Sequence, residues 1–444
     1  MAQVMRKALV GGRLIDGNGG LPLNDAVVLV EGDRILAVGK DVAVPTGVEA
    51  IDCRGKTVMP GLIDAHVHIG TSGGGGADPR EHQSRTLEGN LRSFLIFGVT
   101  SIMDMAAQPQ LAKLKSDLAE GTLLGPRLFG VKYGVTAPGS HPIGLLKELG
   151  AYEKTRGFYT EAESAEMARE HVRRVAADKA DGVKIYHSRS EFPGTMCLDC
   201  NREKMHPEVL RAVIDESHRQ GLRVFAHIAW PSEAREVVEA GGDVLSHPIT
   251  HAESGAREVF ELMAEKGVRM HSTMTRIEAY FGLRVEPFLR EDLKGKVPDA
   301  VLEGMSLQRS VIRRRHQGPG ITGDARRILE ITQANIRRAV KAGVTVTLGT
   351  DSGGAGGLHG AGVPRELELL TESGLTPMQA LVAATRDAAD VIGQGRVLGT
   401  VEAGKLADLL VVDGDPLRDI AHIRRLEKVL RGGVVHVPSE LSAN

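Results

Sequence analysis

One stretch near the N-terminus constrains the fold of this chain more than any other. Residues 59–70 read MPGLIDAHVHIG, in which a Pro-Gly turn precedes a short apolar run interrupted by His66 and His68. This pattern predicts a buried β-strand. Side chains alternate between the faces of a strand, so both imidazoles point the same way, about 7 Å apart along it. They are either two core histidines bonded to backbone groups or half of a metal site.

The glycines after this strand favour the metal site. Gly70 and the four glycines at residues 73–76 predict an open loop at the C-terminal end of the strand. Active sites of α/β barrels lie at that end of their strands.

The middle of the chain, residues 61–398, alternates strand-like apolar runs with amphipathic helical stretches. The full chain of 444 residues leaves room for one large domain and a smaller one. The pattern predicts strands at residues 62–69, 99–104, 127–131, 182–186, 222–227, 243–247, 268–273 and 344–351, and helices at residues 88–97, 110–120, 161–178, 207–220, 231–240, 256–266 and 326–342. Eight such units fit a (β/α)8 TIM-like barrel of the α/β class better than an open doubly wound sheet, which would need a glycine-rich phosphate-binding fingerprint.

Both chain ends are rich in short strands separated by Gly-Gly, Asn-Gly and Gly-Asp turns. Residues 1–60 predict a small antiparallel β unit, and residues 399–444 repeat its style. We therefore expect the two ends to pair into one small domain beside the barrel.

Polar side chains stand at the ends of several predicted barrel strands. Because such strands are buried, a polar residue there belongs to an active site or is a costly misfit. Taken singly, Lys184 could extend to solvent, His227 and His247 could be bonded core residues, and Asp351 could cap a helix or turn. Together they favour one site at the barrel mouth, formed by His66, His68, Lys184, His227, His247 and Asp351.

The chemistry of this set suggests two metal ions. Four imidazoles and a carboxylate suit zinc or a similar divalent cation. A buried Lys184 beside cations tends towards the neutral amine, which can add CO2 and form a carbamate that bridges two metals. Two metals about 3.5–4 Å apart would hold and deprotonate a water between them. Asp351 is then placed to carry a proton to a leaving amine.

Composition limits the partners and the location. The net charge is −2 and charges of both signs are interspersed, so neither nucleic acid nor an anionic membrane is expected as a partner. No apolar run reaches the roughly 18 residues that span a bilayer, which predicts a soluble, cytoplasmic protein. Three cysteines exclude a disulfide framework; Cys197 and Cys200 form a lone CxxC that is either a loop coincidence or a local metal or redox site.

The chain resembles the amidohydrolase superfamily, in its imidazolonepropionase-like and prolidase-like (Xaa-Pro or Xaa-Arg dipeptidase) branch. The resemblance covers nearly the whole chain and is carried by VMPGLIDAHVH at 58–68, GVTSIMD at 98–104, GPR at 125–127, VKI at 183–185, GLRVFAH at 221–227, SH at 246–247, GTD at 349–351 and GTVEAGKLAD at 399–408. It implies a composite β-sandwich domain formed by both chain ends. It also implies a more buried metal on His66, His68 and Asp351, a more exposed one on His227 and His247, and carboxylated Lys184 between them.

The same resemblance suggests substrate contacts and leaves open a homo-oligomer. His141 lies in a loop after the third strand, where this branch often places a histidine that faces the substrate. Tyr186 and His187 closely follow Lys184, and His359 lies in the loop after Asp351. The loop after Lys184 departs from the glycine-rich pattern of many relatives; its Arg189 meets a substrate carboxylate or belongs to a solvated charged loop. His251 and His271 are expected either to support the site residues from behind or to be structural.

These observations predict a metal-dependent hydrolase that cleaves an amide bond of a small substrate, such as an N-acyl amino acid, a dipeptide or a cyclic amide, by a metal-bridging hydroxide. A deaminase, or a hydrolase of an ester, lactone, carbamate or organophosphate, would use the same site. Deaminases of the superfamily usually lack the bridging lysine that Lys184 supplies. A scaffold that has lost its metals is the non-catalytic alternative, and the six filled ligand positions argue against it.

Overall fold

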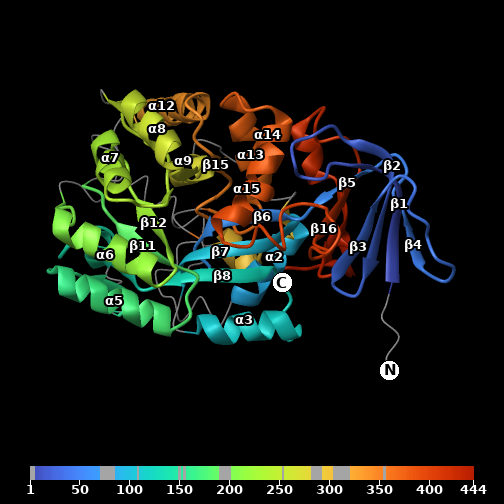
Figure 1. The fold of residues 1–444 in the computed structure, drawn as a ribbon, viewed down its shortest axis with the longest axis horizontal. Coiled ribbons are helices and arrows are strands. Elements are labelled where there is room, and N and C mark those ends of the chain that lie inside the picture. The colour runs from blue at the N-terminus through green and yellow to red at the C-terminus, as the bar shows by residue number, and fades with distance from the viewer. Residues whose placement is uncertain are drawn as a thin grey trace.

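A barrel of parallel strands stands beside a separate sheet that is built from both ends of the chain (Figure 1). The computed structural model describes residues 6–70, 86–107, 110–148, 152–153, 157–189, 202–252, 255–281, 293–303, 321–353 and 357–444. Cys197, Cys200 and the glycines at 73–76 lie outside these residues, so the predictions for them stay untested.

The eight predicted barrel strands are present in the described chain, and their pairing is parallel throughout. They are β6 (Leu62–Val67), β7 (Val99–Ala107), β8 (Arg127–Lys132), β11 (Gly182–Tyr186), β12 (Arg223–His227), β13 (Val244–Leu245), β14 (Arg269–His271) and β15 (Val346–Thr347). Two short strands, β9 (Gly134–Thr136) and β10 (Tyr159–Glu161), extend the sheet beside β11.

The barrel strands form two hydrogen-bonded sheets, one of β6, β7 and β8 and one that runs from β9 through β15, and the two sheets meet at the third strand and beside β6. The third strand is interrupted at Tyr133, whose φ is +50°, so that β8 pairs with β7 and its continuation β9 pairs with β11. On the opposite side, the Ala65 amide donates to the Leu348 carbonyl at 3.1 Å, and the Asp351 amide donates to the His66 carbonyl at 2.8 Å. The first and last strands of the barrel are therefore held side by side.

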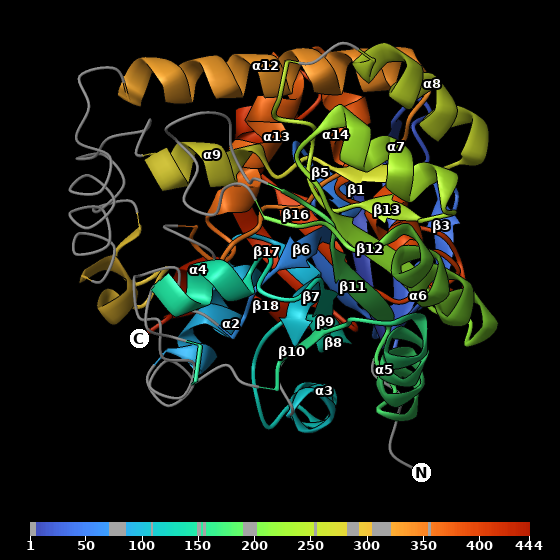
Figure 2. The same cartoon turned by 90° about the vertical axis from the view of Figure 1, so that its left-hand side faces the viewer.

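Helices surround the strands, as the view in Figure 2 shows. Each predicted helix is present within a few residues: α2 (Leu87–Ile96), α3 (Leu111–Glu120), α5 (Ala165–Ala177), α6 (Pro207–Arg219), α7 (Pro231–Glu239), α8 (Ala256–Lys266) and α12 (Ile321–Lys341). The structure adds α4 (Ile143–Glu148), α9 (Met274–Phe281), α13 (Gly362–Glu372), α14 (Pro377–Ala383) and α15 (Arg386–Val391), which the sequence patterns did not reveal.

The second sheet confirms that the chain ends form one composite unit with its own apolar core. Its strands are β1 (Arg6–Leu14), β2 (Leu23–Glu31), β3 (Arg34–Gly39), β4 (Glu49–Asp52), β5 (Thr57–Pro60), β16 (Leu409–Val412), β17 (Leu426–Arg431) and β18 (Val434–His436). Leu9, Val28 and Val58 from one end pack with Leu409 and Leu430 from the other. The prediction of an antiparallel unit is wrong in part, because β4 and β5 both run parallel to β1. The boundaries at 60/61 and 398/399 stay a prediction.

The composite sheet leads directly into the first barrel strand. Only Gly61 separates β5 from β6, and its amide donates to the Asp408 carbonyl at 2.9 Å. A Cβ atom at Gly61 would lie 2.2 Å from Thr100 Oγ1, so no larger residue fits where the chain passes β7. The position of β6 is thus tied to the composite sheet.

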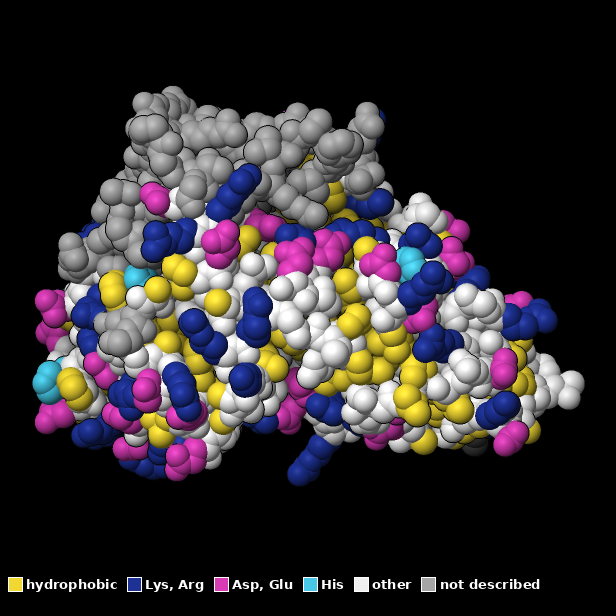
Figure 3. Space-filling view, turned by 90° about the horizontal axis from the view of Figure 1, so that it is seen from above, with side chains coloured by type: hydrophobic (Ala, Val, Ile, Leu, Met, Phe, Trp, Pro, Cys, Tyr) yellow, Lys and Arg dark blue, Asp and Glu magenta, His cyan; other side chains and the backbone are white. Residues whose placement is uncertain are grey.

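The face seen in Figure 3 carries basic and acidic side chains that are interspersed with small apolar areas. Among the described residues, no helix is both long and apolar enough to cross a membrane.

Candidate metal centre

The two histidines of the HVH motif converge on one carboxylate oxygen. His66 is fully buried, and its Nδ1 lies 3.0 Å from the Ser246 carbonyl oxygen. Because a carbonyl only accepts, Nδ1 carries the proton and Nε2 is left as a lone-pair donor. His66 Nε2 lies 3.3 Å and His68 Nε2 lies 2.8 Å from Asp351 Oδ1.

Asp351 is held in an unusual backbone conformation. Its φ is +56°, a left-handed value that a non-glycine residue adopts only with support from its surroundings. The preceding residue supplies that support: buried Asp64 accepts hydrogen bonds from the Thr350 amide at 2.9 Å and from Thr350 Oγ1 at 2.5 Å. This Asp64–Thr350 clamp ties the loop after β15 to β6.

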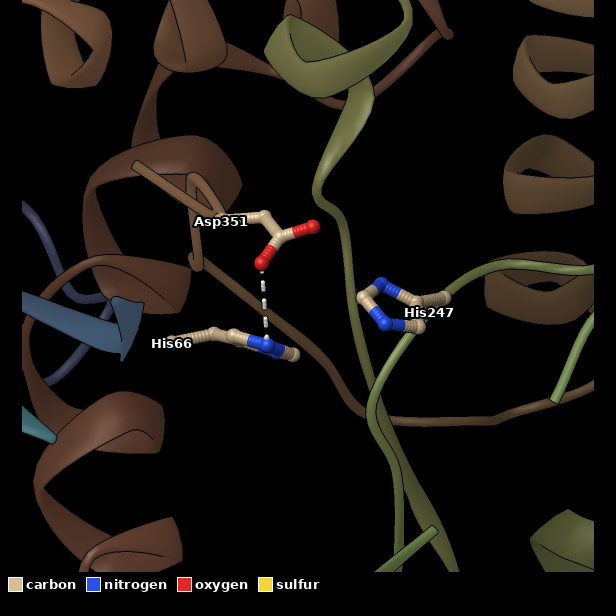
Figure 4. Close-up of side chains that lie close together, drawn as sticks. All are labelled: His66, His247 and Asp351. Atoms are coloured by element: carbon tan, nitrogen blue, oxygen red, sulfur yellow. Dashed lines mark ion pairs between the residues drawn. The ribbon is translucent and has the colours of Figure 1, made fainter. Parts of the chain in front are cut away.

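His247 completes a compact group with His66 and Asp351. One ligand atom from each of the three residues lies within 4.8 Å of the others, and all three residues are buried. Figure 4 shows the His66 ring from β6 against the Asp351 carboxylate, with a dashed line for their 3.3 Å contact, and the His247 ring facing them from the loop after β13. His247 Nδ1 lies 3.1 Å from Thr273 Oγ1.

Lys184 and His227 lie beside this group on neighbouring strands. The His227 ring centroid is 4.5 Å from that of His247, and the His247 centroid is 4.8 Å from that of His66. Lys184 is 1% exposed, and neither its Nζ nor His227 Nε2 has a hydrogen-bond partner in the described chain. Buried polar atoms normally have a hydrogen-bond partner, so these two nitrogens are available to bind a ligand.

Burial keeps most of these bases neutral. It lowers the pKa of His66 to about 3 and the pKa values of His227 and His247 well below the usual range. Burial, opposed by Asp351 and aided by Arg276, also lowers the pKa of Lys184 to about 7. Although burial opposes its ionisation, the adjacent His66 and His68 hold the pKa of Asp351 well below its usual value. Neutral imidazoles, an amine that gives up its proton readily and a carboxylate fit divalent cations.

Two of the predicted substrate contacts lie against this cluster. The His141 ring stacks on the His227 ring, with centroids 4.4 Å apart and planes at 24°. The Tyr186 ring is 5.6 Å from that of His227 and 5.5 Å from that of His141. His359 lies at the end of β6, where its Nε2 is 3.1 Å from the His68 carbonyl oxygen.

Of the five predicted substrate contacts, the remaining two, His187 and Arg189, are not brought to the cluster by the structure. His187 Nε2 lies 2.7 Å from a carboxylate oxygen of Glu236 in α7. The Arg189 amide donates to Glu233 at 2.7 Å, and its guanidinium lies over the Trp230 ring at 5.2 Å. Both side chains therefore contact α7 or the turn that begins it.

Two further residues contact the cluster. His271, expected from the sequence only to support the ligands or the structure, lies at the end of β14 with its Nδ1 3.3 Å from that of His66. Arg276 in α9 has its Nε 3.4 Å from Asp351 Oδ2 and is 7% exposed. It lies five residues beyond a strand, where no sequence signal pointed to the site.

Comparison with known proteins identifies the family of the chain. The sequence profile of the amidohydrolase family matches residues 57–436. The chain is 28% identical to an ochratoxinase of Aspergillus niger, over 93% of this chain and 82% of that protein, and 26% identical to an imidazolonepropionase of Geobacillus kaustophilus, over 94% and 91%.

The fold has solved counterparts as well. The crystal structure of a Xaa-Pro dipeptidase with bound methionine in the active site superimposes with a TM-score of 0.76 at 22% identity, covering 97% of this chain and all of the other. These matches confirm the barrel with a composite domain and the expected resemblance to imidazolonepropionases and prolidases. A family profile that spans most of the chain identifies its enzyme class. The chain belongs to the amidohydrolase family and is a hydrolase.

Proposed function

We propose that this chain is a metal-dependent hydrolase that cleaves the amide bond of a small substrate such as an N-acyl amino acid, a dipeptide or a cyclic amide. The supporting observation is the convergence of His66, His247 and Asp351 within 4.8 Å, with the unpartnered nitrogens of Lys184 and His227 beside them. The names of the relatives, an ochratoxinase and an imidazolonepropionase, point to related chemistry.

The proposal assigns two divalent cations, zinc in the first place, to this site. His66, His68 and Asp351 would hold one, His227 and His247 the other, and Lys184, carboxylated by CO2, would bridge them. When bound, such cations polarise a carbonyl and lower the pKa of a water. The low pKa of Lys184 supports carboxylation, because only a neutral amine adds CO2.

The side chains of the protein supply the remaining functions. Asp351 stays ionised and lies at the centre of the cluster, where it takes up the proton that the attacking water releases and gives it to the departing nitrogen. The rings of His141 and Tyr186 pack beside His227 and orient the substrate. His359 holds the end of β6. For His187 and Arg189, the described contacts support attachment to α7 and not a substrate contact.

Metal content and hydrolysis together test the proposal. Protein purified without chelator and with bicarbonate should carry about two equivalents of zinc, and Lys184→Ala should carry one or fewer. Lys113→Ala, at an exposed helical position, is the matched control and should keep both. Hydrolysis of a panel of N-acetyl amino acids and dipeptides should follow the metal content. About one equivalent of metal that Lys184→Ala does not change would contradict the bridged pair.

The proposal also includes a cytoplasmic location and assembly into a homo-oligomer. Three cysteines in 444 residues suit a reducing compartment. Size-exclusion chromatography with light scattering measures the assembly directly, and a monomer over the whole concentration range would contradict that part.

A further inference from the structure

The short helix α9 is held rigidly by two adjacent residues of α13. Glu366 is fully buried and accepts hydrogen bonds from the Met274 amide at 2.9 Å and the Thr275 amide at 2.7 Å, which are the first two residues of the helix. Arg365 binds Glu278 through two nitrogens at 3.0 and 2.8 Å. The helix backbone between these points is therefore held in place.

Arg276 lies between the two attachment points and faces the cluster. Its Nε is 3.4 Å from Asp351 Oδ2, whereas His66 and His68 approach the other oxygen, Oδ1. The carboxylate thus has a histidine side and an arginine side. After burial, the positive charge of Arg276 is among the causes that lower the pKa values of Lys184 and His247.

The position of Arg276 bears on substrate binding if Asp351 gives its proton to the leaving nitrogen. In an N-acyl amino acid or a dipeptide, that nitrogen bears the Cα atom, and the carboxylate is attached to the same Cα. A cation beside Asp351 is therefore beside the carboxylate of the leaving amino acid. A guanidinium matches a carboxylate with paired hydrogen bonds, and a buried pair of this kind discriminates strongly against a neutral group.

We propose that Arg276 binds the carboxylate of the leaving amino acid, so that this enzyme prefers substrates with a free carboxylate next to the scissile amide. This inference rests on the proposed function. The alternative is that Arg276 only positions Asp351. That role predicts an equal loss of turnover for charged and neutral substrates, because the reacting amide is the same in both.

The test compares each N-acetyl amino acid with its C-terminal amide on zinc-loaded protein. In Arg276→Met, kcat/KM for the carboxylate should fall by about 100-fold or more, mostly through KM, because the contact exists before and during the reaction. For the amide the loss should be smaller by about 10-fold or more, because Arg276→Met then removes only the contact with Asp351. Arg276→Lys, which keeps the charge but not the fork, should lie between. Equal losses for both substrates in Arg276→Met would overturn the proposal.

A binding measurement separates this inference from the proposed function. Calorimetric titration uses 3-phenylpropanoate and its neutral amide as probes, with Arg257→Met, an exposed arginine of α8, as the matched control. Wild type and control should prefer the carboxylate, and Arg276→Met should lose that preference by about 30-fold or more. If the wild type hydrolyses no member of the panel but Arg276→Met still loses the preference, the result contradicts the proposed function and supports the anion site. An unchanged preference in Arg276→Met would overturn the site even if hydrolysis is found.

Discussion

The Asp64–Thr350 clamp should control how tightly the protein binds metal. In Asp64→Ala, the Thr350 amide and hydroxyl lose their acceptor inside the protein, and so does the His66 amide, which lies 3.3 Å from Asp64 Oδ1. A buried unsatisfied donor costs about 1–3 kcal/mol, so the two Thr350 donors alone account for about 2–6 kcal/mol. The clamp holds Asp351 at φ +56°, a conformation that itself costs about 1–3 kcal/mol and needs support.

Most of this free energy should be lost locally. A domain has about 5–15 kcal/mol of total stability, so the fold should survive while the loop that carries Asp351 is released. A cost of about 4 kcal/mol corresponds to about a thousandfold change in an equilibrium constant, so we expect the zinc affinity to fall by about that factor. Competition with a chromophoric chelator measures that affinity, and urea unfolding measures global stability.

A double-mutant cycle provides the control. Thr350→Val removes the hydroxyl but keeps the amide and the shape of the side chain, so it should cost less than Asp64→Ala. The double variant should lose less than the sum of the single variants, by about 0.5–3 kcal/mol, because each single variant already removes the bond between the Thr350 hydroxyl and Asp64. Unchanged zinc affinity together with a lower urea midpoint in Asp64→Ala would refute the reasoning. Additive losses would refute it as well.

Three further outcomes are expected. Asp351→Asn should lower kcat by about 100-fold or more because the amide cannot carry the proton; a fully active variant in the same assay would exclude that role. Glu236→Gln should destabilise the protein at pH 7. Since the hydrogen bond from His187 lowers the pKa of Glu236 from 4.5 to about 2, the difference in unfolding free energy from wild type should disappear as the pH falls through that range, and urea titrations at pH 7 and 3 test it. Gly61→Ala should lower the free energy of unfolding by about 1–3 kcal/mol because its Cβ meets Thr100, and Thr100→Gly should restore most of it; no rescue would place the strain elsewhere.

The sequence predicts the barrel well because its strands are short apolar runs with clear boundaries. Their polar ends also predict which side chains meet, since parallel strands bring their C-terminal ends to one rim. The helices α13–α15 were missed because they follow one another without the strand that the βα pattern requires. The sequence patterns do not predict the parallel pairing of β4 with β1. This pairing depends on how the chain returns to β1 after β3, and local patterns hold no information on such connections.

The candidate site shows a similar division. The sequence places His187 next to Lys184 and Tyr186, but it follows the last residue of β11, and its Nε2 contacts Glu236 in α7. A contact between a residue beyond a strand and a later helix is not encoded in the strand pattern. The approach of Arg276 to Asp351 is not encoded there either, because it depends on how α13 holds α9.

The direct passage from β5 into β6 has a consequence for synthesis. β5 pairs along its whole length with β16, which leaves the ribosome roughly 350 residues later. At about 5–20 residues per second, this delay is roughly 20–70 s. During that time β6 also lacks its partners after β15. The strand that carries the HVH motif is therefore synthesised early but forms its last backbone pairings late. Other parts of the growing chain must cover the apolar edge of this strand until the C-terminal strands have been synthesised.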